Sequence, residues 1–151
     1  SVIFHSFNQI KQNGKVKLFR SHKEGFEDGE QLRDFIYVKD VVKVIFWMMN
    51  QSTIQDEQSK ANNTFTSGIY NLGTGTARTF NDLVNATFSA LKKESNIMYI
   101  DMPDDIRDKY QYFTEATMLK LKHAGYTEPF TSLEEGVHDY VRNYLAAEKY
   151  Y

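Results

Sequence analysis

The sequence predicts an α/β fold built from short strands and several helices. Two observations lead to this prediction: apolar residues recur at helical spacing in five segments, and four short segments are typical of β-strands. A length of 151 residues is enough for one domain with a buried core. The mixed order of the elements, however, is not that of a complete doubly wound domain.

The first expected elements are a helix and a strand. A helix is predicted over residues 1–14, because its apolar residues share one face and Gly14 can end it. Lys15–Phe19 alternates between polar and apolar residues, which is typical of a strand. The polar residues 20–31 that follow are expected to form a solvated loop.

A second strand and a second helix are expected after this loop. Leu32–Val38 predicts a strand, and Asp40 is expected to cap the next helix, since its carboxylate can accept hydrogen bonds from first-turn amides. The stripe of this helix that should face the core consists of Val41, Val44, Ile45 and Met48. Residues 50–67 are polar and without periodicity, so a mobile loop is expected there.

The rest of the chain contains three further predicted helices. Residues 68–75 predict a short strand and a tight turn, after which Thr79 and Asp82 have the spacing of a capping box. That helix should end near Lys93. The remaining expected elements are a strand over 96–100, a helix over 114–125 and a final helix over 131–145.

Residues 68–80 also imitate a dinucleotide-binding fingerprint. In that fingerprint a third glycine allows the helix to pack closely on the strand. Gly73 and Gly75 are present, but Arg78 occupies the third position. A structural turn is therefore the favoured interpretation, and no cofactor-binding residue is expected in this chain.

Composition and motif searches exclude several functions. The net charge of −2 argues against a nucleic-acid partner, and the absence of cysteine excludes disulfides and thiolate metal sites. The longest apolar run, Val44–Met49, is far too short to span a bilayer. No nucleophile elbow, zinc-protease motif or Tyr-x-x-x-Lys pair is present, so no catalytic or metal-ligating residue is assigned. Because the chain begins at Ser1, already inside an apolar pattern, we expect a piece of a longer protein.

Several motifs occur in one order along the chain. They are Phe-His on the opening helix, Leu-Phe before the loop, RDFIYVKDVV, GIYNLGTG, YQYFTEA and AGYTEPFTSLEEGV. In this combination the chain resembles the C-terminal half of the extended short-chain dehydrogenase/reductases. Within that superfamily it is most similar to the ADP-L-glycero-D-manno-heptose 6-epimerases, and the resemblance covers nearly the whole chain.

The resemblance implies that residues 1–151 are a substrate-binding portion that lacks the complete Rossmann domain. An N-terminal domain would bind NADP and carry the catalytic residues, so this chain alone is not expected to be active. The intact enzyme would invert C6 of ADP-D-glycero-D-manno-heptose by transient oxidation and re-reduction, for the inner core of lipopolysaccharide. The resemblance also implies a cytoplasmic homo-oligomer whose partner is a nucleotide-sugar, with neither nucleic acid nor membrane as a partner.

Seven substrate-binding residues follow from the resemblance by position: His5, Phe19, Arg20, Ser21, His22, Arg33 and Tyr110. Arg20 and His22 depart from the Glu and Ser that the family usually has, and the loop after Phe19 is longer than usual. His5 and Phe19 each have a structural alternative. His5 could be a partly buried helix residue, and Phe19 could pack in the core.

Arg33 and Asp34 place opposite charges side by side at the head of the expected strand. Because side chains alternate along a strand, the two charges should face opposite sides. The Arg33 guanidinium could bind a diphosphate through two parallel charge-assisted hydrogen bonds, or it could pair with the acidic residues of 24–30. Asp34 should instead accept hydrogen bonds from backbone or side-chain donors.

Two other functions stay open. The chain could belong to another extended short-chain enzyme that acts on a UDP- or dTDP-sugar, although the DKYQYFTEA stretch argues against it. It could also be a sugar-nucleotide-binding module without catalysis. The nucleotide preference of the intact protein tests the first alternative, and the upstream coding sequence tests the second.

Overall fold

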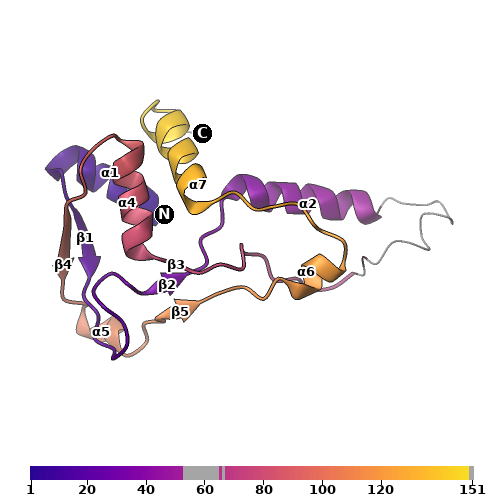
Figure 1. Cartoon of the computed structure of the whole chain (residues 1–151), viewed down its shortest axis with the longest axis horizontal. Coiled ribbons are helices and arrows are strands. Elements are labelled where there is room, and N and C mark those ends of the chain that lie inside the picture. The colour runs from indigo at the N-terminus through magenta and orange to yellow at the C-terminus, as the bar shows by residue number, and fades with distance from the viewer. Residues whose placement is uncertain (53–64, 66, 150–151) are drawn as a thin grey trace. The chain divides into compact units, whose positions relative to one another are not determined.

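The computed structural model describes residues 1–52, 65 and 67–149 (Figure 1). It divides into two compact units, each made of separate stretches of chain. The first unit comprises residues 1–33, 77–114 and 132–151, and the second comprises residues 34–76 and 115–131. The predicted α/β class, with short strands and several helices, is confirmed.

The core of the first unit lies between two helices and a pair of parallel strands. The elements are α1 (Val2–Asn13), β1 (Val16–Phe19), α4 (Phe80–Ala90) and β4 (Ile97–Ile100). Strands β1 and β4 pair in parallel from Val16 opposite Ile97 to Phe19 opposite Ile100. The buried cluster that joins these elements contains Ile10, Val16, Leu18, Val84 and Phe88.

Two helix ends of this unit form as the sequence predicts. Gly14 ends α1 with φ of 67°, and its N–H donates to the Ile10 carbonyl. Thr79 and Asp82 form a complete capping box at the start of α4, but the helix ends at Ala90, before the predicted Lys93. A left-handed φ suits glycine best, which explains why Gly14 is an effective stop signal.

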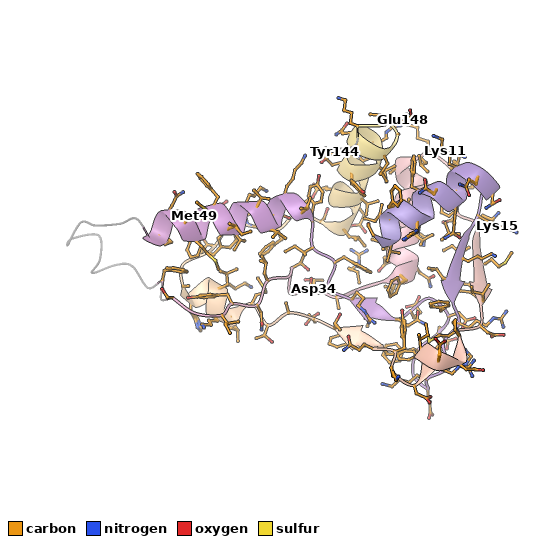
Figure 2. The ribbon with its side chains drawn as sticks, turned by 180° about the vertical axis from the view of Figure 1, so that it is seen from behind. Lys11, Lys15, Asp34, Met49, Tyr144 and Glu148 are labelled. Atoms are coloured by element: carbon orange, nitrogen blue, oxygen red, sulfur yellow. The ribbon has the colours of Figure 1, made fainter. Side chains whose placement is uncertain are left out.

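The first unit also contains a second, smaller sheet and the C-terminal helices. Strand β2 (Leu32–Arg33) lies between β3 (Arg78–Thr79), which is antiparallel to it, and β5 (Phe113–Thr114), which is parallel. The helical elements are α5 (Asp104–Arg107), α7 (Leu133–Tyr140) and the π-helical turn η1 (Val141–Leu145). Lys11 and Glu148, labelled in Figure 2, form an exposed ion pair of 3.4 Å.

The strand predicted over Leu32–Val38 is much shorter than expected. Only Leu32 and Arg33 have partners on both sides, and α2 begins at Val38. After Arg33, the carboxylate of Asp34 accepts the N–H of Ala116, so a side chain replaces the next backbone partner. Residues 68–75 likewise form no strand in the described part of the chain.

The second unit is built around α2 (Val38–Ser52) and the short α6 (Leu119–His123). Its core contains Val44, Met118, Leu121 and Tyr126. The predicted core stripe of α2 is wrong at Ile45, which is 50% exposed, whereas Val44 is fully buried. The exposed apolar face of α2 consists of Val38, Val42, Ile45, Phe46 and Met49, the last of which is labelled in Figure 2.

Asp40 does not cap α2, because the helix already begins at Val38. Its side chain is buried, accepts hydrogen bonds from the backbone N–H and hydroxyl of Thr131 at 2.7 and 2.9 Å, and forms an ion pair with Lys43 at 2.9 Å. Burial pushes the pKa of Asp40 upward, but these bonds outweigh it and hold the pKa below its ordinary value. Asp40 therefore holds α2 against the segment that leaves the second unit.

The loop predicted over 50–67 begins later than expected, because α2 continues through Ser52. The rest of that loop, residues 53–64 and 66, lies outside the described residues. The helix predicted over 114–125 is reduced to α6. Within the described part of the chain, every helix is too short or too polar to cross a bilayer.

Candidate functional site

A cavity of about 410 Å³ lies entirely within the first unit. Its aromatic walls are Phe19, Phe80 and Tyr110, and Val2 and Leu18 add aliphatic surface. The polar groups around it come from His5, Ser6, Gln9, Lys17 and Gln31. Three of the seven predicted site residues, His5, Phe19 and Tyr110, thus meet around one cavity.

Strand β1 contributes to both the core and the cavity. Val16 and Leu18 belong to the buried core cluster, and Lys17 and Phe19 alternate with them and line the cavity, to which Leu18 also contributes. Phe19 is therefore no member of the core cluster, contrary to the structural alternative for this residue. Its ring meets the ring of Tyr110 edge to face, with centroids 6.3 Å apart.

His5 reaches the cavity from α1. It is exposed, so the alternative of a partly buried helix histidine does not hold. Its ring lies 5.9 Å from the ring of Phe4 in an edge arrangement. An exposed imidazole at a cavity rim is free to donate or accept a hydrogen bond from a ligand.

Arg33 lies against two of the aromatic walls of the cavity. Its guanidinium is 5.3 Å from the ring centroid of Tyr110 and 5.8 Å from that of Phe80. An arginine has five N–H donors, and the carbonyls of Leu32 and Gln111 engage two of them. No carboxylate of the described residues forms an ion pair with Arg33, so the predicted alternative, a salt bridge to residues 24–30, is not formed.

The positive charge of Arg33 is thus held in place while several of its donors stay available. Burial raises the pKa of Tyr110, and the charge of Arg33 offsets this rise only in part. Tyr110 therefore stays a neutral phenol at physiological pH. Together the two residues offer a fixed cation and a hydroxyl group at the edge of an aromatic cavity.

Asp34, the other charge of the pair, has a different environment (Figure 2). It accepts hydrogen bonds from the N–H and hydroxyl of Thr74 at 2.7 and 2.6 Å, from Gly75 N–H at 2.9 Å and from Ala116 N–H at 3.0 Å. Burial pushes the pKa of Asp34 upward, but these bonds outweigh it and hold the pKa below its ordinary value. The prediction that Asp34 accepts backbone and side-chain donors is confirmed.

The turn that imitates a dinucleotide fingerprint is filled by its own chain. A Cβ at Gly73 would clash with the Asp34 carboxylate and lie 2.6 Å from the Cβ of Ala116. Arg78, at the third fingerprint position, forms ion pairs with Asp82 at 3.0 Å and Glu134 at 2.6 Å. The described residues here form a structural turn and do not fit a dinucleotide.

The three remaining predicted residues line no part of the cavity. The Ser21 N–H donates to the Asp28 carboxylate at 2.8 Å, and the His22 N–H donates to the Tyr112 hydroxyl at 2.9 Å. The Arg20 side chain donates to the Tyr99 carbonyl at 3.4 Å and is exposed.

The loop over 20–31 is also more structured than a solvated excursion. Asn81 on α4 donates to the Asp28 carbonyl and the Glu30 carboxylate, both at 3.0 Å. Its own oxygen accepts the hydroxyl of Tyr99 at 3.0 Å. These bonds fix the loop against α4 within the first unit, in an arrangement that composition alone does not predict.

Gln31 and Phe80 line the cavity, although sequence analysis did not select them. Phe80 follows the capping residue of α4, and Gln31 precedes Arg33 by two positions. Gln31 could have been predicted from its spacing to Arg33, because residues 31 and 33 lie on the same side of an extended chain. Nothing in the local pattern distinguished Phe80 from an ordinary helix residue.

A larger cavity, of about 660 Å³, lies along α4 and α7 but offers less chemistry. Its carboxylates are engaged by the protein, since Asp82 and Glu134 bind Arg78 and Glu135 caps α7. No aromatic ring other than His138 lines it. The residues that the structure describes also contain no cluster of metal-ligating side chains.

Comparisons with known proteins agree with the sequence resemblance. The profile of the NAD dependent epimerase/dehydratase family matches residues 1–73. An ADP-L-glycero-D-manno-heptose-6-epimerase from Fusobacterium nucleatum is 52% identical over 157 residues, which cover 100% of this chain and 44% of that protein. The chain thus spans less than half the length of this relative.

Solved structures show the same relationship. The Helicobacter pylori ADP-L-glycero-D-manno-heptose-6-epimerase matches with a TM-score of 0.62 and 28% identity, over 94% of this chain and 36% of that chain. The Thermus thermophilus UDP-glucose 4-epimerase, solved in complex with NAD, matches with a TM-score of 0.63 and 22% identity, over 91% of this chain and 37% of that chain. The second match shows a common fold only. The resemblance predicted from the motifs is confirmed.

Proposed function

Because the chain is similar over its whole length to ADP-L-glycero-D-manno-heptose 6-epimerases, we propose that it is the nucleotide-sugar-binding part of such an enzyme. The intact enzyme inverts C6 of ADP-D-glycero-D-manno-heptose by transient oxidation and re-reduction, in the cytoplasm, for the lipopolysaccharide inner core. It acts as a homo-oligomer, and residues 1–151 are its C-terminal portion. The NADP that exchanges the hydride is held by an N-terminal Rossmann domain, since the glycine turn around Gly73 in this chain is filled by Asp34 and Ala116.

The single observation that carries the proposal is the aromatic cavity with Arg33 at its edge. Phe19, Phe80 and Tyr110 offer ring faces and edges against which a planar base can pack. A volume of about 410 Å³ lies within the range of small-molecule sites. A nucleoside placed there brings its 5′-diphosphate to the cavity edge, where a cation is required.

Arg33 supplies that cation in a form suited to a diphosphate. A planar guanidinium can bind two phosphate oxygens at once, which a point charge cannot do. Its two carbonyl partners and its contacts with the rings of Tyr110 and Phe80 hold the guanidinium in place, so little conformational entropy is lost when the ligand binds. The absence of an ion-pair partner among the described residues leaves its charge to the ligand.

His5 and Tyr110 add hydrogen-bonding groups to the cavity lining. The exposed imidazole of His5 and the neutral phenol of Tyr110 can bind ribose or sugar hydroxyls, since each can donate or accept. Arg20, Ser21 and His22 are proposed as substrate contacts only from the resemblance, because they lie outside the cavity lining. None of these residues is proposed to take part in the hydride transfer.

A binding panel on the intact protein tests this function. Thermal shift and calorimetric titration with ADP-, UDP- and dTDP-sugars should show the tightest binding for the ADP-sugars. Incubation with ADP-D-glycero-D-manno-heptose should then yield the C6 epimer. Preference for a UDP- or dTDP-sugar would assign the chain to another extended short-chain enzyme. Sugar-nucleotide binding by a protein whose gene encodes no Rossmann domain would make it a binding module.

A further inference from the structure

Gln31 is a nearly buried residue whose side-chain amide uses only its nitrogen in the hydrogen bonds of the described residues. Its side chain is 1% exposed, and the residue lines the aromatic cavity. The Nε2 group donates to the carbonyls of Phe19 and Arg20 at 3.4 and 3.5 Å. No donor among the described residues reaches the oxygen Oε1. An amide oxygen of a cavity-lining residue that no protein donor reaches is able to accept a hydrogen bond from a ligand.

The orientation of this amide follows from its neighbours. The two nearest groups on one side are carbonyl oxygens, which can only accept. Placing Oε1 there would set three acceptors against one another, so Nε2 must face these carbonyls. The oxygen is therefore directed away from these two carbonyls and stays available as an acceptor in a residue that lines the cavity.

The backbone of Gln31 fixes this position further. Its carbonyl accepts the N–H of Phe80, whose ring forms another wall of the same cavity. Gln31 also precedes Arg33 by two residues, so both side chains lie on the same side of the extended chain. An acceptor at the wall and a cation at the edge are thus held on one short segment.

We propose that Gln31 determines base specificity, with Oε1 accepting a hydrogen bond from the exocyclic amino group of adenine. This proposal rests on the proposed function, because it takes the cavity as the base site. Adenine offers an N–H donor at C6, whereas hypoxanthine has an acceptor oxygen at that position. The site should therefore discriminate between ADP and inosine diphosphate, which are otherwise alike in ribose, diphosphate and ring shape.

The test is calorimetric titration of the intact protein with ADP and with inosine diphosphate. The wild type should prefer ADP by roughly three- to tenfold, the range expected for one hydrogen bond. In Gln31→Met, which keeps the volume but offers no strong acceptor, the two affinities should become nearly equal. Gln9→Met is the matched control, because Gln9 also lines the cavity but its oxygen accepts the Lys17 N–H at 2.9 Å. That variant should keep the wild-type preference.

A second variant separates recognition of the base from the hydrogen bonds that Gln31 donates to the carbonyls of Phe19 and Arg20. Gln31→Glu, titrated at mildly acidic pH, keeps a carbonyl acceptor and, when its buried carboxyl group is protonated, an O–H donor. Its preference for ADP should survive, and this also covers the case in which Gln31→Met does not fold. If Gln31→Met keeps the preference for ADP, or if Gln31→Glu loses it, the role proposed for Gln31 is wrong. If the wild type binds neither nucleotide, the proposed function itself fails.

Discussion

Arg33 and Asp34 are neighbours in the chain, yet their surroundings differ in a way that separates a binding charge from a structural one. Every strong acceptor position of Asp34 is used, by backbone amides and a hydroxyl of the second unit. Arg33 has two carbonyl partners, two aromatic rings and no carboxylate among the described residues. A charge whose hydrogen bonds are satisfied supports the fold, and a held charge with donors left over is suited to a ligand.

The largest expected effect comes from removing the structural charge. Asp34→Ala leaves the N–H groups of Thr74, Gly75 and Ala116 without their acceptor, so the free energy of unfolding should fall by about 3 kcal/mol. Chemical denaturation should detect the loss as a lower midpoint. Asp101→Ala is the control, because that carboxylate is largely exposed and should change stability little. A change for Asp34→Ala no greater than for Asp101→Ala would contradict the structural role.

Removing the binding charge should act on affinity instead. Arg33→Ala should weaken ADP binding by about 1.5–3 kcal/mol, the range for hydrogen bonds to charged groups, or roughly ten- to a hundredfold. The loss should be similar for ADP and ADP-heptose, since the contact is to the shared diphosphate. Arg33→Lys should recover only part of it, because lysine lacks the planar fork.

Titration calorimetry and thermal melting of the same samples check this prediction. Arg142→Ala is the matched control, because Arg142 is an exposed arginine of η1 outside the cavity lining and the proposed substrate contacts. Unchanged ADP binding together with a melting temperature several degrees lower would make Arg33 a structural residue, like its neighbour.

The close packing at Gly73 offers a way to sharpen the comparison. Gly73→Ala places a methyl group against the Asp34 carboxylate and Ala116, so it should cost about 1–3 kcal/mol of stability, as overpacking does. In an Asp34→Ala background the same change should cost less, because one of the clashing groups is gone. A double-mutant cycle by chemical denaturation measures this coupling, and simple additivity would show that the turn does not depend on Asp34.

The smallest effect concerns pH. The folded pKa of Asp34 lies below its ordinary value, so its ionised form stabilises the fold at neutral pH. That contribution is fully present above the unfolded pKa and is lost as the pH falls through the folded pKa. The stability difference between the wild type and Asp34→Asn should therefore shrink as the pH is lowered from neutral through the folded pKa of Asp34. A difference that stays constant over this range would show that the charge of Asp34 adds nothing.

The sequence predicted features that depend on a few neighbouring residues. The capping box of Thr79 and Asp82 and the stop at Gly14 are local, so their residue types were sufficient. Leu32–Val38 alternates like a strand, but its length depends on distant partners, which pair with only two of its residues. Ile45 was expected in the core because α2 is apolar on more than one face, and only tertiary packing decides which face is buried.

The residues of the candidate site also fall into those that the sequence could predict and those that it could not. His5, Phe19, Arg33 and Tyr110 came from the resemblance and lie in or against one cavity. Gln31 was missed because its role depends on the carbonyls of Phe19 and Arg20, which approach it only in the folded chain. The hydrogen bonds of the loop over 20–31 could not be predicted either, since they join it to α4 and Tyr112 across long stretches of sequence.

The two units are interleaved along the chain, and this has a consequence for how the molecule is made. The second unit consists of residues 34–76 and 115–131, so each unit is complete only after the chain has left the other and returned. During synthesis, α2 emerges long before the residues around Met118 and Tyr126 that cover Val44. Folding must therefore close loops of many tens of residues, which slows it and leaves apolar surface exposed to association in the meantime. No single cut in the chain can separate the units, so neither can be expressed alone by truncation.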